Sequence, residues 1–142
     1  MGVAMIKTNF LVRFTECDPY GIASHPNYFN WLMECRIDYF RKCGLTVDDF
    51  NNSNILLVIV RINMICKDAC TFGDQIEIET ILQKINKKSI AFKYIAKNIN
   101  TNRVVFEAET VNFVINKEGT LCSFPDYIYE KIINYNNTEG GG

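Results

Sequence analysis

PNYFNWLMECRIDYFRKCG, residues Pro26 to Gly44, is the stretch that decides the fold. Pro26 suits the first turn of a helix, because its ring already has a helical φ and its missing N–H would have no intrahelical partner. Gly44 is typical of a helix end, since glycine readily takes the left-handed conformation found there. The segment therefore predicts a helix of about 18 residues, roughly 27 Å long.

Apolar side chains cover most of this predicted helix. They form two stripes, one of Phe29, Leu32, Met33, Ile37 and Phe40, the other of Tyr28, Trp31, Cys35 and Tyr39. A surface helix has one apolar stripe, whereas a helix that is apolar on most sides is enclosed by other structure. We therefore expect this helix to lie inside the domain.

The flanking segments predict the enclosing structure. A strand is expected before the helix at residues 7–15, and the following β-rich runs are Ile55–Cys66, Gln75–Gln83, Ser89–Lys97 and Val104–Ile115. Short polar links at residues 84–88 and 98–103 predict hairpins, and a short final helix is expected at residues 127–133. The predicted fold class is thus α+β, an antiparallel sheet wrapped around one long helix.

Length and composition narrow the class of protein. The 142 residues fit one domain, predicted at residues 1–133, and the polar segment 134–142 has little to bury and is expected to be a disordered tail. A net charge of −1 gives no reason to expect nucleic-acid binding. No apolar run approaches the ~18 residues of a membrane span.

The cysteines and the first nine residues allow predictions about metal binding and about the cellular compartment. Six cysteines and one histidine lack the close spacing of a zinc site, so no metal or other cofactor is predicted. Residues 1–9 contain no apolar run of the signal-peptide type. The expectation is a cytoplasmic protein with six free thiols.

The candidate for chemistry is Asp18, seven residues before the predicted helix. No G-x-S-x-G elbow or phosphate-binding loop occurs, and no nucleophile is marked as a partner for His25. The first N–H groups of a helix have no intrahelical partners and carry about +0.5 charge, which suits a developing oxyanion. A nearby aspartate could activate water or attack directly, and Gly21 permits a sharp turn between the two. Spacing alone equally allows Asp18 to be only the capping residue of an Asx-turn.

The segment from Val12 to Gly44 resembles the 4-hydroxybenzoyl-CoA thioesterase family of hot-dog proteins. It is also similar to the short-chain acyl-CoA thioesterases associated with the Tol–Pal system. The shared pattern D-x-x-G-x-x-x-[HY]-x-N-Y is represented by Asp18, Gly21, His25, Asn27 and Tyr28. The resemblance extends over about residues 6–132. It implies a hot-dog fold, hydrolysis of an acyl-CoA thioester, and homodimers or homotetramers with active sites between subunits.

The resemblance also implies roles for individual residues. Asp18 matches the catalytic carboxylate, as nucleophile or general base, and His25 occupies the position whose backbone N–H polarises the thioester carbonyl. The His25 imidazole either assists or only packs. Gly21, Ile22 and Ser24 are expected to shape the loop and the acyl pocket, although many relatives carry an aromatic residue at position 24. Substrate binding is also assigned to Lys87 and Lys88, two lysines of a predicted turn. They could instead be simply solvated.

Several functions remain open on the sequence alone. The carrier could be an acyl-carrier protein in place of CoA, and a non-catalytic acyl-CoA-binding protein would have the same fold. A hot-dog dehydratase would need a catalytic histidine with a helix carboxylate. His25 and Glu34 formally exist, but His25 lies in the thioesterase motif. A distinct hot-dog thioesterase branch has its catalytic carboxylate on the long helix, where Glu34 also lies, but Glu34 is interpreted as a solvated or ion-paired residue of the polar helix band.

Overall fold

The structure, a computed structural model, describes residues 5–140. Its elements follow the chain as β1 (Met5–Leu11), a 3-10 turn (Phe14–Glu16), α1 (Pro26–Lys42), α2 (Val47–Asn52), β2 (Ile55–Cys66), β3 (Gln75–Asn86), β4 (Ser89–Asn98), β5 (Arg103–Asn116), α3 (Asp126–Tyr135) and a π-helical turn (Asn136–Gly140). In the described part of the chain, no helix is long and apolar enough to cross a membrane.

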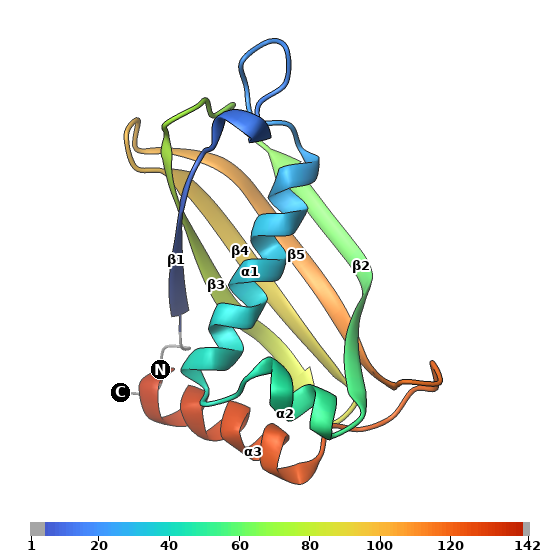
Figure 1. Cartoon of the computed structure of the whole chain (residues 1–142). Helices are drawn as coiled ribbons and strands as arrows, with labels where there is room; N and C mark the ends of the chain where they lie inside the picture. Colours follow the sequence, from blue (N-terminus) through green and yellow to red (C-terminus); the bar gives the residue numbers. More distant parts are fainter. Residues whose placement is uncertain (1–4, 141–142) are drawn as a thin grey trace.

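The strands form one antiparallel sheet in the order β1-β3-β4-β5-β2, which curves around α1 (Figure 1). This arrangement confirms the predicted α+β hot-dog architecture. The loop between β1 and α1 projects from one end of the sheet, whereas α2 and α3 lie at the opposite end. The long helix thus links a loop end, which carries Asp18, to a helical end.

The core lies between α1 and the concave face of the sheet. Side chains of β4 alternate strictly between buried and partly exposed, as a strand with one covered face should. The ring of Tyr28 stacks on Phe106 with centroids 4.7 Å apart, and that of Tyr39 meets Phe92 edge-on at 4.9 Å. The stripe predicted to contain Tyr28, Trp31, Cys35 and Tyr39 is entirely buried. That stripe fixes which face of α1 meets the sheet.

The second apolar stripe of α1 is only partly covered. Leu32 and Phe40 are buried, but Phe29 is 44% exposed and Ile37 is 37% exposed. The expectation of a helix enclosed on most sides is therefore wrong for a single chain, because the sheet covers one side of α1 only. An apolar surface remains along the other side.

Strand β2 continues this uncovered surface. It is an edge strand, and the β5 residues opposite its inward-facing positions, such as Asn112 opposite Ile59, are buried. Ile59 itself remains 38% exposed, and the inward-facing Ile62 and Met64 are only half-buried. The concave face of the sheet therefore extends past the helix that fills it. Natural edge strands are usually protected by charge or cover, and Arg61 is the sole charged residue of β2.

Three segments differ from the expectations. The strand predicted at residues 7–15 ends at Leu11, because residues 14–16 turn into a 3-10 helix stabilised by the Glu16 side chain. The short helix α2 was not predicted. The disordered tail was placed too early, because α3 continues through residues 134–135 and the Asn136 side chain donates to the Tyr39 hydroxyl at 2.7 Å. Residues 141–142 lie outside the described part.

Candidate active site

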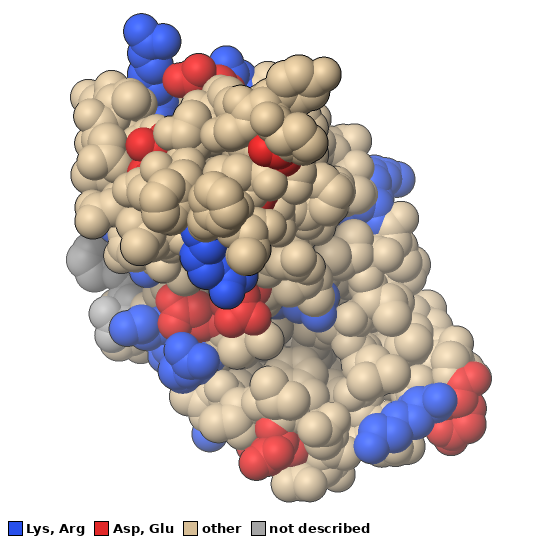
Figure 2. Space-filling model, turned by 45° about the horizontal axis from the view of Figure 1, so that its top comes forward, with Lys and Arg blue, Asp and Glu red and all other residues tan. Residues whose placement is uncertain are grey.

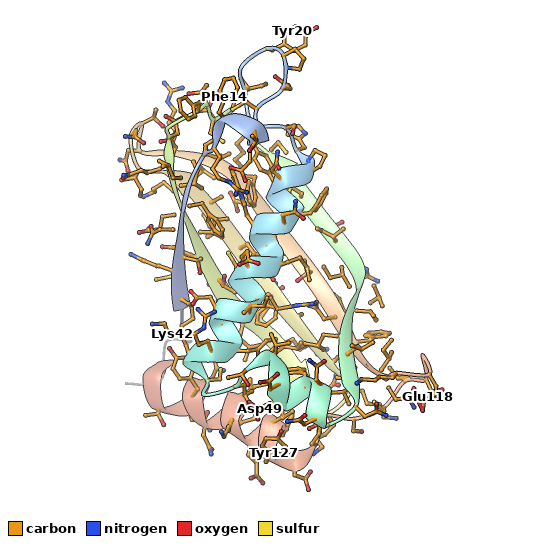
Figure 3. All side chains as sticks on the ribbon, in the orientation of Figure 1. Phe14, Tyr20, Lys42, Asp49, Glu118 and Tyr127 are labelled. Carbon is orange, nitrogen blue, oxygen red and sulfur yellow. The ribbon has the colours of Figure 1, made fainter. Side chains whose placement is uncertain are left out.

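The loop that carries Asp18 is a small hairpin. Cys17 and Ala23 form an antiparallel bridge at its base, and the Asp18 N–H donates to the Ile22 carbonyl at 2.9 Å. A β-turn closes it, with the Gly21 N–H donating to the Asp18 carbonyl at 2.9 Å and Gly21 at φ +83°. Glycine is required there because side chains strain that conformation. Tyr20 at the tip is 90% exposed and points away from the domain (Figure 3).

The Asp18 carboxylate is held by one of its two oxygens. Oδ1 accepts the Tyr20 N–H at 2.9 Å and the Ile22 N–H at 3.4 Å, which is the Asx-turn that the composition allowed. Within residues 5–140, Oδ2 has no hydrogen-bond partner. The turn therefore fixes the orientation of the carboxylate and leaves one oxygen available to a ligand.

His25 stands at the start of α1 as its N-cap residue. The next N–H groups are already bonded, Asn27 to the Ser24 carbonyl at 3.1 Å and Tyr28 to the His25 carbonyl at 2.9 Å. The His25 N–H has no acceptor in the described chain, and Pro26 has no N–H. His25 thus presents one free backbone donor at the positive end of a helix of 17 residues. Its exposed imidazole stacks on Tyr28, with centroids 5.3 Å apart and an interplanar angle of 30°.

Glu16 joins the loop to the helix, a role that the sequence reading missed. Its side chain is buried, and Oε1 accepts the Arg13 N–H at 2.8 Å. Oε2 accepts both the Arg13 guanidinium at 3.2 Å and the Trp31 indole N–H at 3.0 Å. Burial alone would raise the pKa of Glu16, but these three donors outweigh it and hold the pKa below its ordinary value.

The backbone carbonyl of Glu16 completes this brace. It accepts the Ser24 N–H at 2.9 Å, the Ser24 hydroxyl at 3.3 Å and the Asn27 side-chain amide at 2.8 Å. The residue two before Asp18 is thereby bonded to the residues on both sides of His25. Ser24 and Asn27 act in this structure as positioning residues of the loop base.

The other predicted site residues divide into two groups. Gly21, Ile22 and Ser24 lie in the loop with Asp18, as expected for residues that shape it. Lys87 and Lys88 lie in the β3–β4 turn, at the end of the domain where α3 lies and opposite the Asp18 loop (Figure 1). Lys87 makes two contacts there: its Nζ pairs with Asp126 of α3 and lies 4.9 Å from the centre of the Tyr129 ring. One chain therefore does not bring the two lysines to Asp18.

The face of the molecule that includes the loop end is electrostatically mixed. Figure 2 shows acidic and basic side chains interspersed over a surface that is mostly neither. The Glu34 side chain is exposed on α1, as a solvated helix residue would be. At this end the loop carboxylate has one oxygen without a hydrogen-bond partner, and the helix start has one free backbone N–H, among the described residues.

An antiparallel sheet wrapped around one long helix is the hot-dog fold. Residues 12–132 match the family model described as the thioesterase-like superfamily. The chain belongs to this superfamily. The resemblance inferred from residues 12–44 is thereby confirmed.

Known proteins support this placement. The chain is 31% identical over 88 residues to the 4-hydroxybenzoyl-CoA thioesterase of Pseudomonas sp. strain CBS-3, covering 58% of this chain and 61% of that protein. It is 24% identical over 138 residues to a chloroplastic palmitoyl-acyl carrier protein thioesterase of Arabidopsis thaliana, covering 92% of this chain but only 34% of that longer protein. A solved 4-hydroxybenzoyl-CoA thioesterase mutant, complexed with 4-hydroxybenzoyl-CoA, shares the fold with a TM-score of 0.81 at 23% identity, covering 90% of this chain and 98% of that one.

Proposed function

We propose that this protein hydrolyses an acyl-CoA thioester to the free acid and CoA. The observation that carries the proposal is the free backbone N–H of His25 at the start of α1, tied through Glu16 to the loop of Asp18. A bound thioester needs an electrophilic contact on its carbonyl oxygen and a carboxylate near its carbonyl carbon. This part of the chain offers both in a member of a thioesterase superfamily.

The carbonyl oxygen of the thioester would accept a hydrogen bond from the His25 N–H. As the tetrahedral intermediate forms, negative charge builds on that oxygen, and the helix end stabilises it more than it stabilises the neutral carbonyl. Removing one such donor from an oxyanion hole typically costs about 10²–10³ in rate. The imidazole of His25, stacked on Tyr28, orients the backbone of the N-cap.

Asp18 would supply the attack through its free Oδ2. As a general base it takes a proton from water while the water oxygen bonds to the carbonyl carbon; as a nucleophile it bonds to that carbon itself, and water then cleaves the anhydride. In both routes the C–S bond breaks, and the CoA sulfur leaves as a thiolate that takes up a proton. The Asx-turn serves either route, because it fixes the carboxylate without using both oxygens.

The acyl group of the substrate could be carried either by CoA or by an acyl-carrier protein. One relative acts on 4-hydroxybenzoyl-CoA and another on palmitoyl-acyl carrier protein, so the superfamily match leaves both carriers available. We favour CoA because the chain is 31% identical to the 4-hydroxybenzoyl-CoA thioesterase and covers 61% of it, against 24% identity and 34% coverage for the palmitoyl-acyl carrier protein thioesterase. Matched acyl-CoA and acyl-carrier-protein substrates separate the two by their kcat/KM values.

We also propose a homodimer, built through the uncovered side of α1 and the edge of β2. Exposed Phe29, Ile37 and Ile59 supply an apolar surface there, and the unpaired edge of β2 can add a second sheet. Such pairing would also bring the turn of Lys87 and Lys88 within the same assembly as the partner's loop.

All six cysteines are free thiols. Free thiols are typical of a reducing compartment, so we propose that the protein is cytoplasmic.

Asp18→Asn tests the proposal, because the amide keeps the Asx-turn acceptor but can neither attack nor take a proton. We expect kcat to fall at least a hundredfold on a panel of aryl, short-chain and long-chain acyl-CoA substrates, with unchanged Tm. Asp48→Asn, at an exposed position of α2, is the matched control and should keep full activity. Full turnover by Asp18→Asn would refute the assignment, and binding of acyl-CoA without turnover by the unaltered protein would indicate a non-catalytic binder.

A further inference from the structure

A pocket that opens to solvent lies between α1, α2 and β2, at the end of α1 opposite the Asp18 loop. Its volume is about 240 Å³, and its walls are mainly apolar, including Ile37, Phe40, Leu45, Val47, Phe50 and Leu56. For scale, an engineered apolar cavity of about 150 Å³ in another protein holds benzene. Arg36, which also lines the cavity, lies roughly 15 Å along the helix axis from Pro26. The cavity is therefore separate from the Asp18 loop of the same chain.

Arg36 is the one charged side chain among the residues that line this cavity. It is partly buried, and its Nη1 donates to the Asn112 Oδ1 at 2.8 Å. Asn112 is neutral, and its own amide donates to the Ile90 carbonyl at 3.1 Å and the Thr110 hydroxyl at 3.2 Å. Within residues 5–140, no carboxylate lies within ion-pair distance of Arg36. Among the described residues, this guanidinium thus has no counter-ion.

A partly desolvated guanidinium without a carboxylate partner is unusual in a folded chain. Charged groups away from water are normally paired, because the cost of burial is otherwise uncompensated. Burial accordingly lowers the pKa of Arg36. A guanidinium carries five N–H donors in a planar fork that matches a carboxylate, and Asn112 occupies only one. Arg36 therefore keeps donors that could bind an anion, in a pocket whose other lining residues are mostly apolar.

We propose that this cavity binds a small monocarboxylate, with its carboxylate paired to Arg36 and its aryl or short alkyl group against the apolar walls. The two halves of the ligand are each specified by a separate feature, the charge by Arg36 and the hydrocarbon by the residues of α2 and β2. A volume of about 240 Å³ limits that hydrocarbon to a single ring or a chain of similar bulk. Because this is equilibrium binding without a thioester, it stands or falls independently of the hydrolase proposal.

Methyl-labelled NMR on the full chain in its native oligomeric state tests the site directly. Benzoate is titrated as the probe, with benzamide as its neutral counterpart. We expect shifts at Leu45, Val47 and Leu56, with benzamide binding at least tenfold more weakly than benzoate. Arg36→Met should weaken benzoate binding at least tenfold, whereas Arg41→Met is the matched control, since Arg41 is exposed on the same helix and outside the cavity.

A second variant keeps the test decisive if Arg36→Met does not fold. Val47→Trp leaves Arg36 and its bond to Asn112 in place but fills the cavity from α2, so benzoate affinity should fall at least fivefold. Equal affinity for benzoate and benzamide would overturn the proposal. So would unchanged affinity in Arg36→Met or Val47→Trp, or shifts confined to methyl groups near the Asp18 loop, such as Ile22.

Discussion

Replacing Glu16 by glutamine tests whether this buried carboxylate holds the Asp18 loop to the helix α1. The change keeps the size of the side chain but removes its charge and converts one acceptor oxygen into a donor. Arg13 N–H points at Oε1, while the Arg13 guanidinium and the Trp31 indole both point at Oε2. A glutamine has only one side-chain oxygen, so it can accept hydrogen bonds at only one of these two positions. At the other position its NH₂ group would face a donor.

The expected loss of stability follows from the hydrogen bonds that the substitution removes. A hydrogen bond to a charged group contributes about 1.5–3 kcal/mol, and leaving a buried donor unsatisfied costs about 1–3 kcal/mol. Because Trp31 is only 3% exposed, water does not readily replace the lost acceptor. We expect Glu16→Gln to lower the free energy of unfolding by about 2–4 kcal/mol at pH 7. Glu118→Gln, the same change at an exposed turn position, should alter it by less than about 0.5 kcal/mol.

The pH dependence separates a charge effect from a packing effect. The pKa of Glu16 is lowered in the folded state from an ordinary value of 4.5, so the folded state favours the ionised form. Such a group stabilises the protein above its unfolded pKa, and this stability is lost as the pH falls through the folded pKa. The wild-type protein should therefore lose its advantage over Glu16→Gln as the pH falls below about 4.5.

Urea denaturation of the two proteins between pH 7 and pH 3 measures both quantities, provided that the unfolding remains two-state. Thioester hydrolysis measured alongside should show a lower kcat/KM for Glu16→Gln, since the Glu16 carbonyl and side chain together fix Ser24, Asn27 and the loop. A stability difference that is small at pH 7, or that stays constant down to pH 3, would refute the charged brace.

Two further predictions address the loop turn and the subunit contact. Gly21→Ala puts a side chain at φ +83°, so we expect a loss of about 1–3 kcal/mol and a lower kcat; an unchanged Tm and kcat would show that the turn relaxes freely. Ile59→Asp puts a charge on the exposed inner edge of β2 and should make the protein sediment as a monomer in sedimentation-velocity runs if the proposed homodimer forms through this edge. The exposed Glu109→Gln of the neighbouring strand should leave the assembly unchanged.

The arrangement of the long elements could be predicted because their signals are local. Pro26 and Gly44 bracket α1, which ends at Lys42 with Cys43 as its cap, and β2 has the bounds that its apolar run indicated. Alternation also identified the other three strands of the hairpin series, within a few residues at their ends. These patterns reflect the periods of helix and strand, so no knowledge of distant contacts was needed.

The helix α2 and the Glu16 brace were missed for different reasons. Helix α2 has six mostly polar residues and no apolar period, but a capping box between Thr46 and Asp49 marks its start. Glu16 gives no local signal at all. A glutamate in sequence is expected at the surface, and its burial depends on Trp31 arriving from the helix. Only the fold could reveal that contact.

The sequence predicted that the uncovered side of α1 is apolar, but the expectation that the same chain covers it was wrong. A helical pattern records which side chains avoid water and does not record whether the same chain or another copy shields them. The buried face of Tyr28 and Tyr39 meets the sheet of its own chain, whereas Phe29 and Ile37 remain exposed.

The two interpretations of Asp18, as an Asx-turn residue and as a catalytic carboxylate, are compatible with each other. An Asx-turn uses one carboxylate oxygen, and general-base or nucleophilic attack needs one. Here Oδ1 takes the bonds from the Tyr20 and Ile22 N–H groups, which limits the carboxylate to one orientation. A catalytic carboxylate on a projecting loop would otherwise sample many orientations, and holding a reacting group in place lowers the entropy cost of attack. The turn that makes Asp18 look structural is thus the feature that would make a loop aspartate an effective catalyst.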